Sequence, residues 1–261
     1  MPSAYLLVSH GSRDSRPQVA MERLSWLLAQ SQTRIRPQLR TFGKVMKGVA
    51  GEAQKAEKGV TPSFSLVGTA CLELAAVPLH EQVIEFGDRA LKSGYNRIEI
   101  VPLFLLPGVH VMEDIPAEVA IAQNSLGSRL ELDLKPHLGT HPGLVKLLAQ
   151  KATTKAAWIL LAHGSRRAGA KQPVEGIAQQ LGARSAYWAV PPSLASRVQE
   201  LVSAGHEQIG IIPYFLFAGG ITDAIAQEVA QLRGQFPVEI HLAEPLGASQ
   251  ELALLILDLV D

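Results

Sequence analysis

One pattern in this chain occurs twice and constrains its fold. Residues 5–13 read YLLVSHGSR and residues 158–166 read WILLAHGSR, each an apolar run followed by His-Gly-Ser-Arg. A second pair follows in the same order, GYNRIEIVPLFL at 94–105 and GHEQIGIIPYFL at 205–216. Two matched blocks in one order indicate an internal duplication. The chain is therefore predicted to fold as two lobes of one design, over residues 1–141 and 142–261.

Each copy alternates apolar runs with amphipathic segments. Near-continuous apolar runs predict strands that are covered on both faces, and strand–helix alternation predicts a parallel α/β sheet. In the first copy we expect strands near 4–9, 64–71, 97–105 and 130–136, with helices near 17–30, 76–93 and 113–126. In the second we expect strands near 157–162, 184–190, 208–216 and 238–243, with helices near 170–181, 192–204 and 221–233. A connecting helix over 141–154 and a terminal helix over 251–260 complete the prediction.

One segment of the first copy has no counterpart in the second. Residues from about 31 to 64 carry seven basic residues against two glutamates, together with four glycines. Such a composition buries too little apolar surface to offset its ordering entropy. We expect a mobile basic flap over the binding cleft, with a solvated loop of no function as the alternative. The basic residues are Arg34, Arg36, Arg40, Lys44, Lys47, Lys55 and Lys58.

Composition narrows the class of protein. Lys and Arg number 24, as do Asp and Glu, so no nucleic-acid or anionic-membrane partner is expected. No apolar run reaches the roughly 18 residues that span a bilayer. No basic region precedes the apolar N-terminal stretch, which argues against a signal peptide. The single cysteine, Cys71, excludes an internal disulfide and a cysteine-based metal site within one chain. A cytoplasmic location is expected.

Three side chains that can bind a metal or accept protons follow three strands of the first copy. His10 follows the first strand, Glu73 the second and His110 the third. Ligands of open parallel sheets bind outside the carboxyl ends of the strands, so the topology should bring these residues together. Taken singly, each has a plainer interpretation as a polar cap, a helix-start glutamate or an exposed loop residue. The other histidines, which show no such convergence, are expected at the surface or in packing: His80, His137, His141, His206 and His241.

Two imidazoles and one carboxylate favour a particular chemistry. This ligand set suits iron(II), cobalt(II), nickel(II) or zinc(II), and three protein ligands leave coordination positions open. The same groups can accept protons near neutral pH. The second copy keeps His163 but has Ala189 in place of Glu73 and no histidine in the loop 217–221. We therefore expect the second lobe to retain the scaffold and to lack the metal chemistry.

The repeated His-Gly-Ser-Arg motif also suggests phosphate chemistry, which the surrounding sequence does not support. The Gly and Ser amides can begin an anion-binding turn. No phosphate-binding glycine-rich loop follows the first strand, and Ser12 lies outside a Gly-x-Ser-x-Gly elbow. Ser9 also precedes His10 where a histidine phosphatase would carry arginine. A phosphoryl-transfer enzyme is thus the weaker alternative.

Three motifs resemble one family. The strand ending LLVSHGSR, the segment CLELAAVPLHEQV and the stretch VPLFLLPGVHVMEDIP look like those of the class II chelatases of the CbiX/SirB type. The second copy is similar to the C-terminal half of the long, two-lobed members. The resemblance covers most of residues 4–140. The basic insertion departs from it, and the sequence has neither the histidine-rich tail nor the cluster-binding cysteine set seen in some long members.

The resemblance carries expectations about fold and activity. It implies two flavodoxin-like lobes around a cleft, and insertion of iron(II) or cobalt(II) into sirohydrochlorin without ATP or any cofactor beyond the substrate metal. It places the metal and catalytic residues on His10, Glu73 and His110. Residues expected to contact the tetrapyrrole and its carboxylates are Ser12, Arg13, Leu106, Pro107, Gly108 and Val109. Leu105 can add to the apolar cleft wall.

Several alternatives stay open at this stage. Iron insertion for sirohaem and cobalt insertion for cobalamin suit the ligand set equally, and nickel insertion into a related macrocycle is a further option. A metal-carrying protein without catalysis is the alternative from another class, separated from a chelatase by multiple turnover. Two fused units already supply the pair of lobes that short members obtain by dimerising, so a functional monomer is expected.

Overall fold

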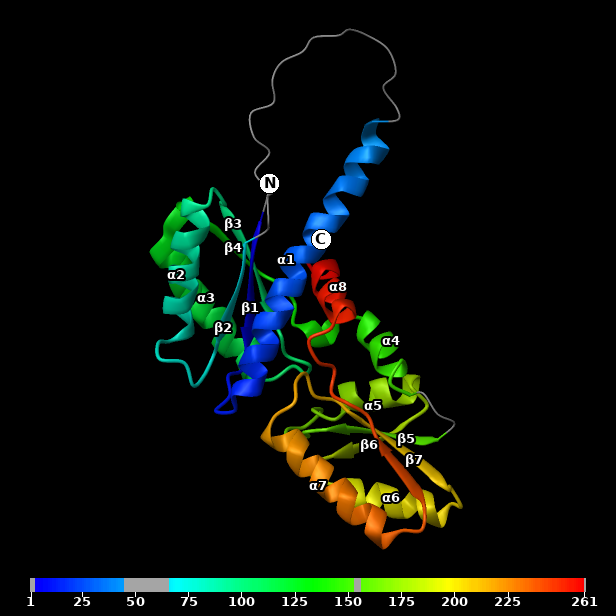
Figure 1. Ribbon diagram of the computed structural model, residues 1–261. Coiled ribbons are helices and arrows are strands. Elements are labelled where there is room, and N and C mark those ends of the chain that lie inside the picture. The colour runs from blue at the N-terminus through cyan, green and yellow to red at the C-terminus, as the bar shows by residue number, and fades with distance from the viewer. Residues whose placement is uncertain (1–2, 45–65, 153–155, 261) are drawn as a thin grey trace.

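The computed structural model describes residues 3–44, 66–152 and 156–260. It contains two four-stranded parallel sheets of the same topology (Figure 1). The N-terminal sheet has the order β2-β1-β3-β4, and the C-terminal sheet has the order β6-β5-β7-β8. Their bounds are β1 Ala4–Ser9, β2 Val67–Cys71, β3 Arg97–Pro102, β4 Glu131–Leu134, β5 Ala157–Ala162, β6 Arg184–Tyr187, β7 Gln208–Pro213 and β8 Glu239–Leu242. The duplicated α/β architecture predicted from the repeat is confirmed.

Helices cover both faces of each sheet. Their bounds are α1 Ser15–Lys44, α2 Leu79–Lys92, α3 Ile115–Leu126, α4 Gly143–Ala149, α5 Gln172–Gln180, α6 Leu194–Ser203, α7 Gly220–Gln235 and α8 Gln250–Asp258. Figure 1 shows α2 and α3 on the outer side of one lobe, α6 and α7 on the outer side of the other, and α1, α8, α4 and α5 between the sheets. None of the helices in the described ranges combines the length and apolarity needed to cross a membrane.

The central layer makes one core out of the two lobes. Leu7, Leu24 and Val101 from the N-terminal lobe belong to the same buried apolar cluster as Leu160 and Ile212 from the C-terminal lobe. Separate clusters lie under α2 and α3 and under α6 and α7. Burial of apolar side chains is the main stabilising contribution in folding, so the shared cluster couples the stability of the two lobes.

Polar contacts also join elements that are distant in sequence. The α8 residue Gln250 donates from Nε2 to the Ser31 hydroxyl of α1 at 2.5 Å. The Tyr214 hydroxyl, which follows β7, donates to the Leu105 carbonyl, which follows β3, at 3.1 Å. This second contact fixes the two strand-exit loops against each other, and burial raises the pKa of the Tyr214 phenol.

The third strand of each lobe ends earlier than the sequence predicts. Strands β3 and β7 end at Pro102 and Pro213, three residues before the predicted ends at 105 and 216. Proline lacks the N–H that a central strand needs, which makes it a natural point for a strand to end. The apolar residues that follow instead lead into the loops of the cleft.

The helix predicted over 17–30 is much longer in the structure. Helix α1 continues to Lys44, so the expectation of a loop across the first part of 31–64 was wrong. Arginine, glutamine and leucine in 34–40 are good helix formers, whereas Pro37 in the same stretch opposes a helix. The rest of the proposed basic flap lies outside the described residues, and its role stays a prediction.

Candidate metal and tetrapyrrole site

Three neighbouring strands bring the predicted metal ligands together. Strand β1 lies between β2 and β3, so the carboxyl ends of all three are adjacent. His10 directly follows β1, Glu73 follows β2 by two residues, and His110 opens a π-helical turn after β3, His110–Asp114. One ligand atom from each residue lies within 4.8 Å of the others. The predicted convergence is therefore present in the structure.

Both imidazoles direct the same nitrogen toward one carboxylate. His10 Nε2 lies 3.8 Å from Glu73 Oε2, and His110 Nε2 lies 3.9 Å from Glu73 Oε1. The two rings meet nearly edge-on, with centroids 4.9 Å apart. Metal–ligand bonds of about 2.1 Å place neighbouring ligand atoms roughly 3–3.5 Å apart, so small rotations would close this set around an ion. The side chains are a third to a half exposed, which leaves the site accessible.

The second ring nitrogen of each histidine also has a partner. His110 Nδ1 lies 2.7 Å from Asp114 Oδ2, and His10 Nδ1 lies 3.3 Å from the Gly11 carbonyl. Carboxylate or carbonyl partners of this kind fix the ring orientation and the tautomer of metal-ligating histidines. The sequence motifs alone gave no role to Asp114. Its spacing of four residues after His110 was a usable signal, because residues four apart share a helix face.

A glycine makes the close approach of these loops possible. The Glu73 N–H donates to the His10 carbonyl at 2.8 Å. Gly11 has φ +101°, and a Cβ there would stand 2.0 Å from the Glu73 carbonyl oxygen. Glycine is thus required both by the left-handed conformation and by the contact. Leu74 also has a positive φ, of 60°, which is unusual for a non-glycine residue and marks a constrained backbone beside Glu73.

The C-terminal lobe repeats this turn without the ligands. Ala189 donates its N–H to the His163 carbonyl at 2.8 Å, and Gly164 has φ +81°. These bonds confirm that Ala189 is the structural counterpart of Glu73. Within the described parts of the chain, the His10, Glu73 and His110 set is the one group of three potential metal ligands.

A cavity of about 610 Å³ adjoins His10 and Glu73 and lies between the lobes. Its polar wall includes His10, Ser12 and Gln18 of the N-terminal lobe, whereas the loop after β7 supplies an apolar wall. The residues that line the cavity from that loop and from the first turn of α7 are Phe215, Leu216, Phe217, Gly219, Gly220, Ile221 and Thr222. The contribution of this loop was not foreseen from the sequence. A cavity with both polar and apolar walls suits a ring with an apolar face and a polar rim.

The residues expected to contact the tetrapyrrole differ in whether they line the cavity. Ser12 lines the cavity and accepts a hydrogen bond from the Asp14 N–H at 3.0 Å. Arg13 is exposed on the same turn. Leu106, Pro107, Gly108 and Val109 fall outside the set of described residues that line the cavity. Leu106 packs on the central core, and the Gly108 carbonyl accepts from the N–H of Met112 at 2.9 Å, so this loop shapes the turn that presents His110.

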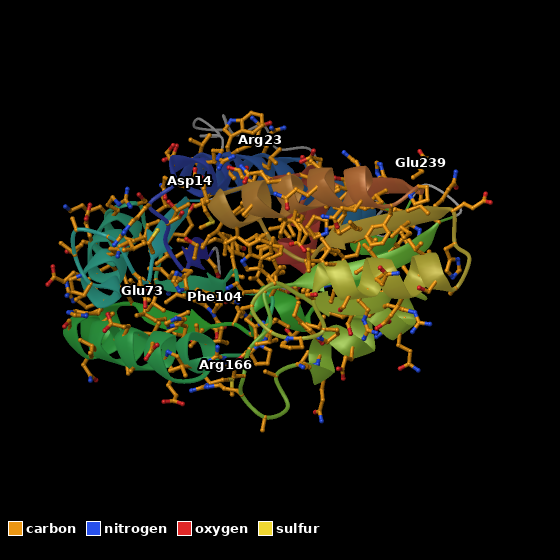
Figure 2. The ribbon with its side chains drawn as sticks, turned by 90° about the horizontal axis from the view of Figure 1, so that it is seen from below. Asp14, Arg23, Glu73, Phe104, Arg166 and Glu239 are labelled. Carbon is orange, nitrogen blue, oxygen red and sulfur yellow. The ribbon has the colours of Figure 1, made fainter. Side chains whose placement is uncertain are left out.

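Apolar groups surround the metal ligands. The Phe104 ring centroid lies 6.4 Å from the ring centroids of both His10 and His110. In Figure 2, Phe104 lies between Glu73 and the C-terminal lobe. Leu74 and Met112 leave 59% and 66% of their surface exposed close to the ligands. Exposed apolar side chains grouped at a site favour contact with an apolar ligand face.

An ion-pair clamp connects the lobes beside the cavity. Arg16 at the start of α1 bonds Asp223 in α7, through Nη1 to Oδ1 at 2.9 Å and Nη2 to Oδ2 at 2.5 Å, and it also pairs with Asp14. The Arg16 hydrogen bonds lower the pKa of Asp14 to about 2 and also lower the pKa of Asp223. A bidentate guanidinium–carboxylate pair fixes relative orientation, so this clamp sets the spacing of the cavity walls.

Most of the remaining histidines have evident packing roles. His80 Nδ1 lies 2.8 Å from Glu118 between α2 and α3. His137 and His141 are buried, and they pair with the Phe104 carbonyl and with Asp258. His206 and His241 are exposed. The prediction that these residues lie at the surface or in packing is confirmed.

Comparison with known proteins supports the interpretation of this fold. A sirohydrochlorin ferrochelatase from Bacillus subtilis is 27% identical over 190 residues, which cover 67% of this chain and 72% of the relative. A second, from Priestia megaterium, is 26% identical over 176 residues, which cover 61% of this chain and 66% of the relative. Among solved structures, the sirohydrochlorin chelatase SirB from Bacillus subtilis subspecies spizizenii in complex with cobalt aligns with a TM-score of 0.69 at 22% identity, over 100% of this chain and 94% of that one. SirB from Bacillus subtilis with Fe3+ aligns with a TM-score of 0.71, also at 22% identity and with the same coverage of both chains.

The fold and the site define a two-lobed α/β protein in which three potential metal ligands converge. The CbiX family model matches the chain twice, over residues 44–155 and 157–261. The chain belongs to the CbiX family. The double match agrees with the internal duplication, and the first match includes Glu73 and His110. His10 lies before the matched range, so its assignment rests on the geometry of the site.

Proposed function

We propose that this protein is a metal chelatase that inserts a divalent ion, Fe²⁺ or Co²⁺, into sirohydrochlorin without ATP. The observation that carries the proposal is the convergence of His10, Glu73 and His110 beside an interlobe cavity. Family membership and the named activity of the Bacillus subtilis relative support the same reaction. The metal is a substrate here, together with the tetrapyrrole.

The residues can perform the two parts of the reaction. The imidazole Nε2 atoms and the Glu73 carboxylate hold the ion on one face of the macrocycle, with coordination positions left for the ring nitrogens. As those nitrogens replace the protein ligands, two pyrrole N–H protons must leave. The freed imidazole and carboxylate groups can accept these protons because they lie at the same point.

The surrounding groups can position the macrocycle. Phe104 stands beside both imidazoles, and Leu216 and Phe217 line the opposite wall of the cavity. An apolar ring face packs favourably against such side chains, since its burial removes apolar surface from water. The Asp114 contact holds His110 in the orientation that the transfer requires.

Turnover tests the proposal against a metal carrier. Metal-free protein, excess sirohydrochlorin and excess Fe²⁺ or Co²⁺ are mixed anaerobically, and the shift in tetrapyrrole absorption is followed. A chelatase gives many metallated products per chain above the spontaneous rate. At most one product per chain would instead indicate a carrier. Parallel reactions with Fe²⁺, Co²⁺ and Ni²⁺ compare kcat/KM and identify the preferred ion.

We also propose that one chain is sufficient for activity and acts in the cytoplasm. The cavity takes both of its walls from a single chain, which supports a functional monomer. Light scattering during turnover should report the monomer mass. A cavity that is complete only in a higher oligomer would contradict this part of the proposal, and cell fractionation would test the location.

A further inference from the structure

A second recess, of about 570 Å³, opens in the C-terminal lobe. Three of its lining residues are cations, Arg166, Arg167 and Lys171. Among the described residues that line it, Glu175 is the one anion. We call this region the basic recess. Its cations follow β5, on the loop that leads into α5.

The basic recess includes the counterpart of one of the three predicted metal ligands of the other lobe. Ala189, the structural counterpart of Glu73, lines it. The turn beside it also has the same backbone pattern in both lobes. The Asp14 N–H donates to Ser12 Oγ at 3.0 Å, and the Arg167 N–H donates to Ser165 Oγ at 3.2 Å.

At these matched positions one negative charge is replaced by a positive charge and a second negative charge is lost. The turn places Arg167 where the N-terminal lobe has Asp14, and Ala189 where it has Glu73. The turn beside the predicted metal ligands of one lobe thus corresponds to a turn rich in cations in the other. Retention of the fold requires the glycine turn at Gly164, but it does not require two adjacent arginines.

The two guanidinium groups are available for a ligand. Within the described parts of the chain, neither the Arg166 nor the Arg167 side chain has a hydrogen-bond or ion-pair partner, and both residues are exposed. Lys171 is held at the wall, because its Nζ donates to the Pro191 carbonyl at 2.7 Å and lies 5.2 Å from the Tyr187 ring centroid. The recess therefore combines one fixed cation with two whose donors are free.

The basic recess faces the same end of the lobe as the metal-site cavity. Strands β5 and β7 are parallel neighbours, with Leu161 opposite Pro213. The loops after both strands consequently leave one edge of the sheet, and the loop after β7 lines the cavity. In Figure 2, Arg166 lies at the end of the C-terminal lobe nearest the N-terminal lobe, below Phe104 in the view.

We propose that the basic recess binds carboxylate groups on the rim of the tetrapyrrole, an inference that rests on the proposed function. Sirohydrochlorin is an octacarboxylate, and guanidinium groups pair with carboxylates in a bidentate geometry. The N-terminal lobe then holds the metal while the C-terminal lobe recognises the charged rim. The degenerate copy contributes substrate binding in place of metal binding.

Binding of an octacarboxylate porphyrin to the full-length protein without metal tests this assignment. Arg166→Gln and Arg167→Gln are compared with Arg184→Gln, which removes the same charge from an exposed residue at the opposite end of the same sheet. We expect Kd for the porphyrin to rise about fivefold in each recess variant, the size of one exposed ion pair. The effect should shrink in high salt, and it should be smaller for a dicarboxylate porphyrin. Circular dichroism and Co²⁺ affinity should match the wild type.

The outcomes separate this inference from the proposed function. Equal Kd values in the recess variants and in Arg184→Gln would overturn the recess assignment, even if the wild type turns over. Loss of inorganic phosphate binding with unchanged porphyrin affinity would also overturn it and would indicate a free phosphate site. Weaker porphyrin binding by Arg166→Gln and Arg167→Gln supports the recess assignment even if the protein shows no chelatase activity.

Discussion

His110 Nδ1 lies 2.7 Å from the Asp114 carboxylate, so its Nε2 atom is the nitrogen that faces Glu73 and the proposed metal position. Replacement of this carboxylate should therefore weaken the metal site without removing a ligand. We expect Asp114→Asn to lower Co²⁺ affinity by about tenfold or more, in line with other partners of metal-ligating histidines. Isothermal titration with Co²⁺ measures the change.

The neighbouring Glu113 provides a matched control for that measurement. It is exposed on the same turn, so Glu113→Gln removes one carboxylate charge without breaking the His110 contact. Its Co²⁺ affinity should stay within about twofold of the wild type, since an exposed charge contributes little. Equal losses in the two variants would mean that local charge, rather than ring orientation, is responsible.

The turn after β1 should tolerate no side chain at Gly11. Gly11→Ala places a Cβ 2.0 Å from the Glu73 carbonyl oxygen in a backbone with φ +101°. Gly94 has φ +82° but open space around its Cβ position, so Gly94→Ala isolates the conformational cost. We expect a loss of about 1 kcal/mol for Gly94→Ala and at least about 2 kcal/mol for Gly11→Ala. Urea unfolding provides both values, and similar losses would show that the contact with Glu73 is relieved cheaply.

The repeat and the apolar runs were sufficient to predict the paired parallel sheets, because each strand is buried on both faces and its sequence reflects that burial. Strand adjacency then predicted that His10 and Glu73 would meet. The Asp114 contact depends on a π-helical turn that apolar periodicity does not indicate. The loop after β7 lines the cavity because one lobe packs on the other. The sequence of either copy alone does not indicate that packing. Helix α1 continues beyond the predicted end at residue 30 because the basic, glycine-containing composition of the next segment was interpreted as a loop.

The interlobe clamp gives a stability difference that depends on pH. Arg16 lowers the pKa of Asp14 to about 2 from an ordinary 3.8, and it also lowers the pKa of Asp223. A carboxylate whose pKa is lowered in the folded state stabilises that state above its ordinary pKa and loses the effect as pH falls toward the lowered value. Wild type should therefore exceed Arg16→Gln in Tm at pH 6, and the gap should narrow from about pH 4 downward. Thermal unfolding across this pH range measures the difference in Tm, with Arg23→Gln as control. A difference in Tm that does not change with pH would exclude an origin in the Arg16 ion pairs.

The C-terminal lobe should bind no second metal ion of comparable affinity. Ala189 replaces Glu73, and the described residues hold no other group of three potential ligands. Equilibrium dialysis with Co²⁺ should give one ion per chain for the wild type and for His163→Ala. A stoichiometry of two that falls to one in His163→Ala would show that the second copy has kept a metal site.

The proposed metal insertion depends most on the two imidazoles beside Glu73. The most direct measurement is the anaerobic rate of Co²⁺ insertion into sirohydrochlorin by His10→Ala and His110→Ala, with the exposed His206→Ala as control. We predict a fall of at least about tenfold in kcat/KM for each of the first two variants and a wild-type rate for the control. Wild-type turnover in well-folded His10→Ala and His110→Ala proteins would contradict the account.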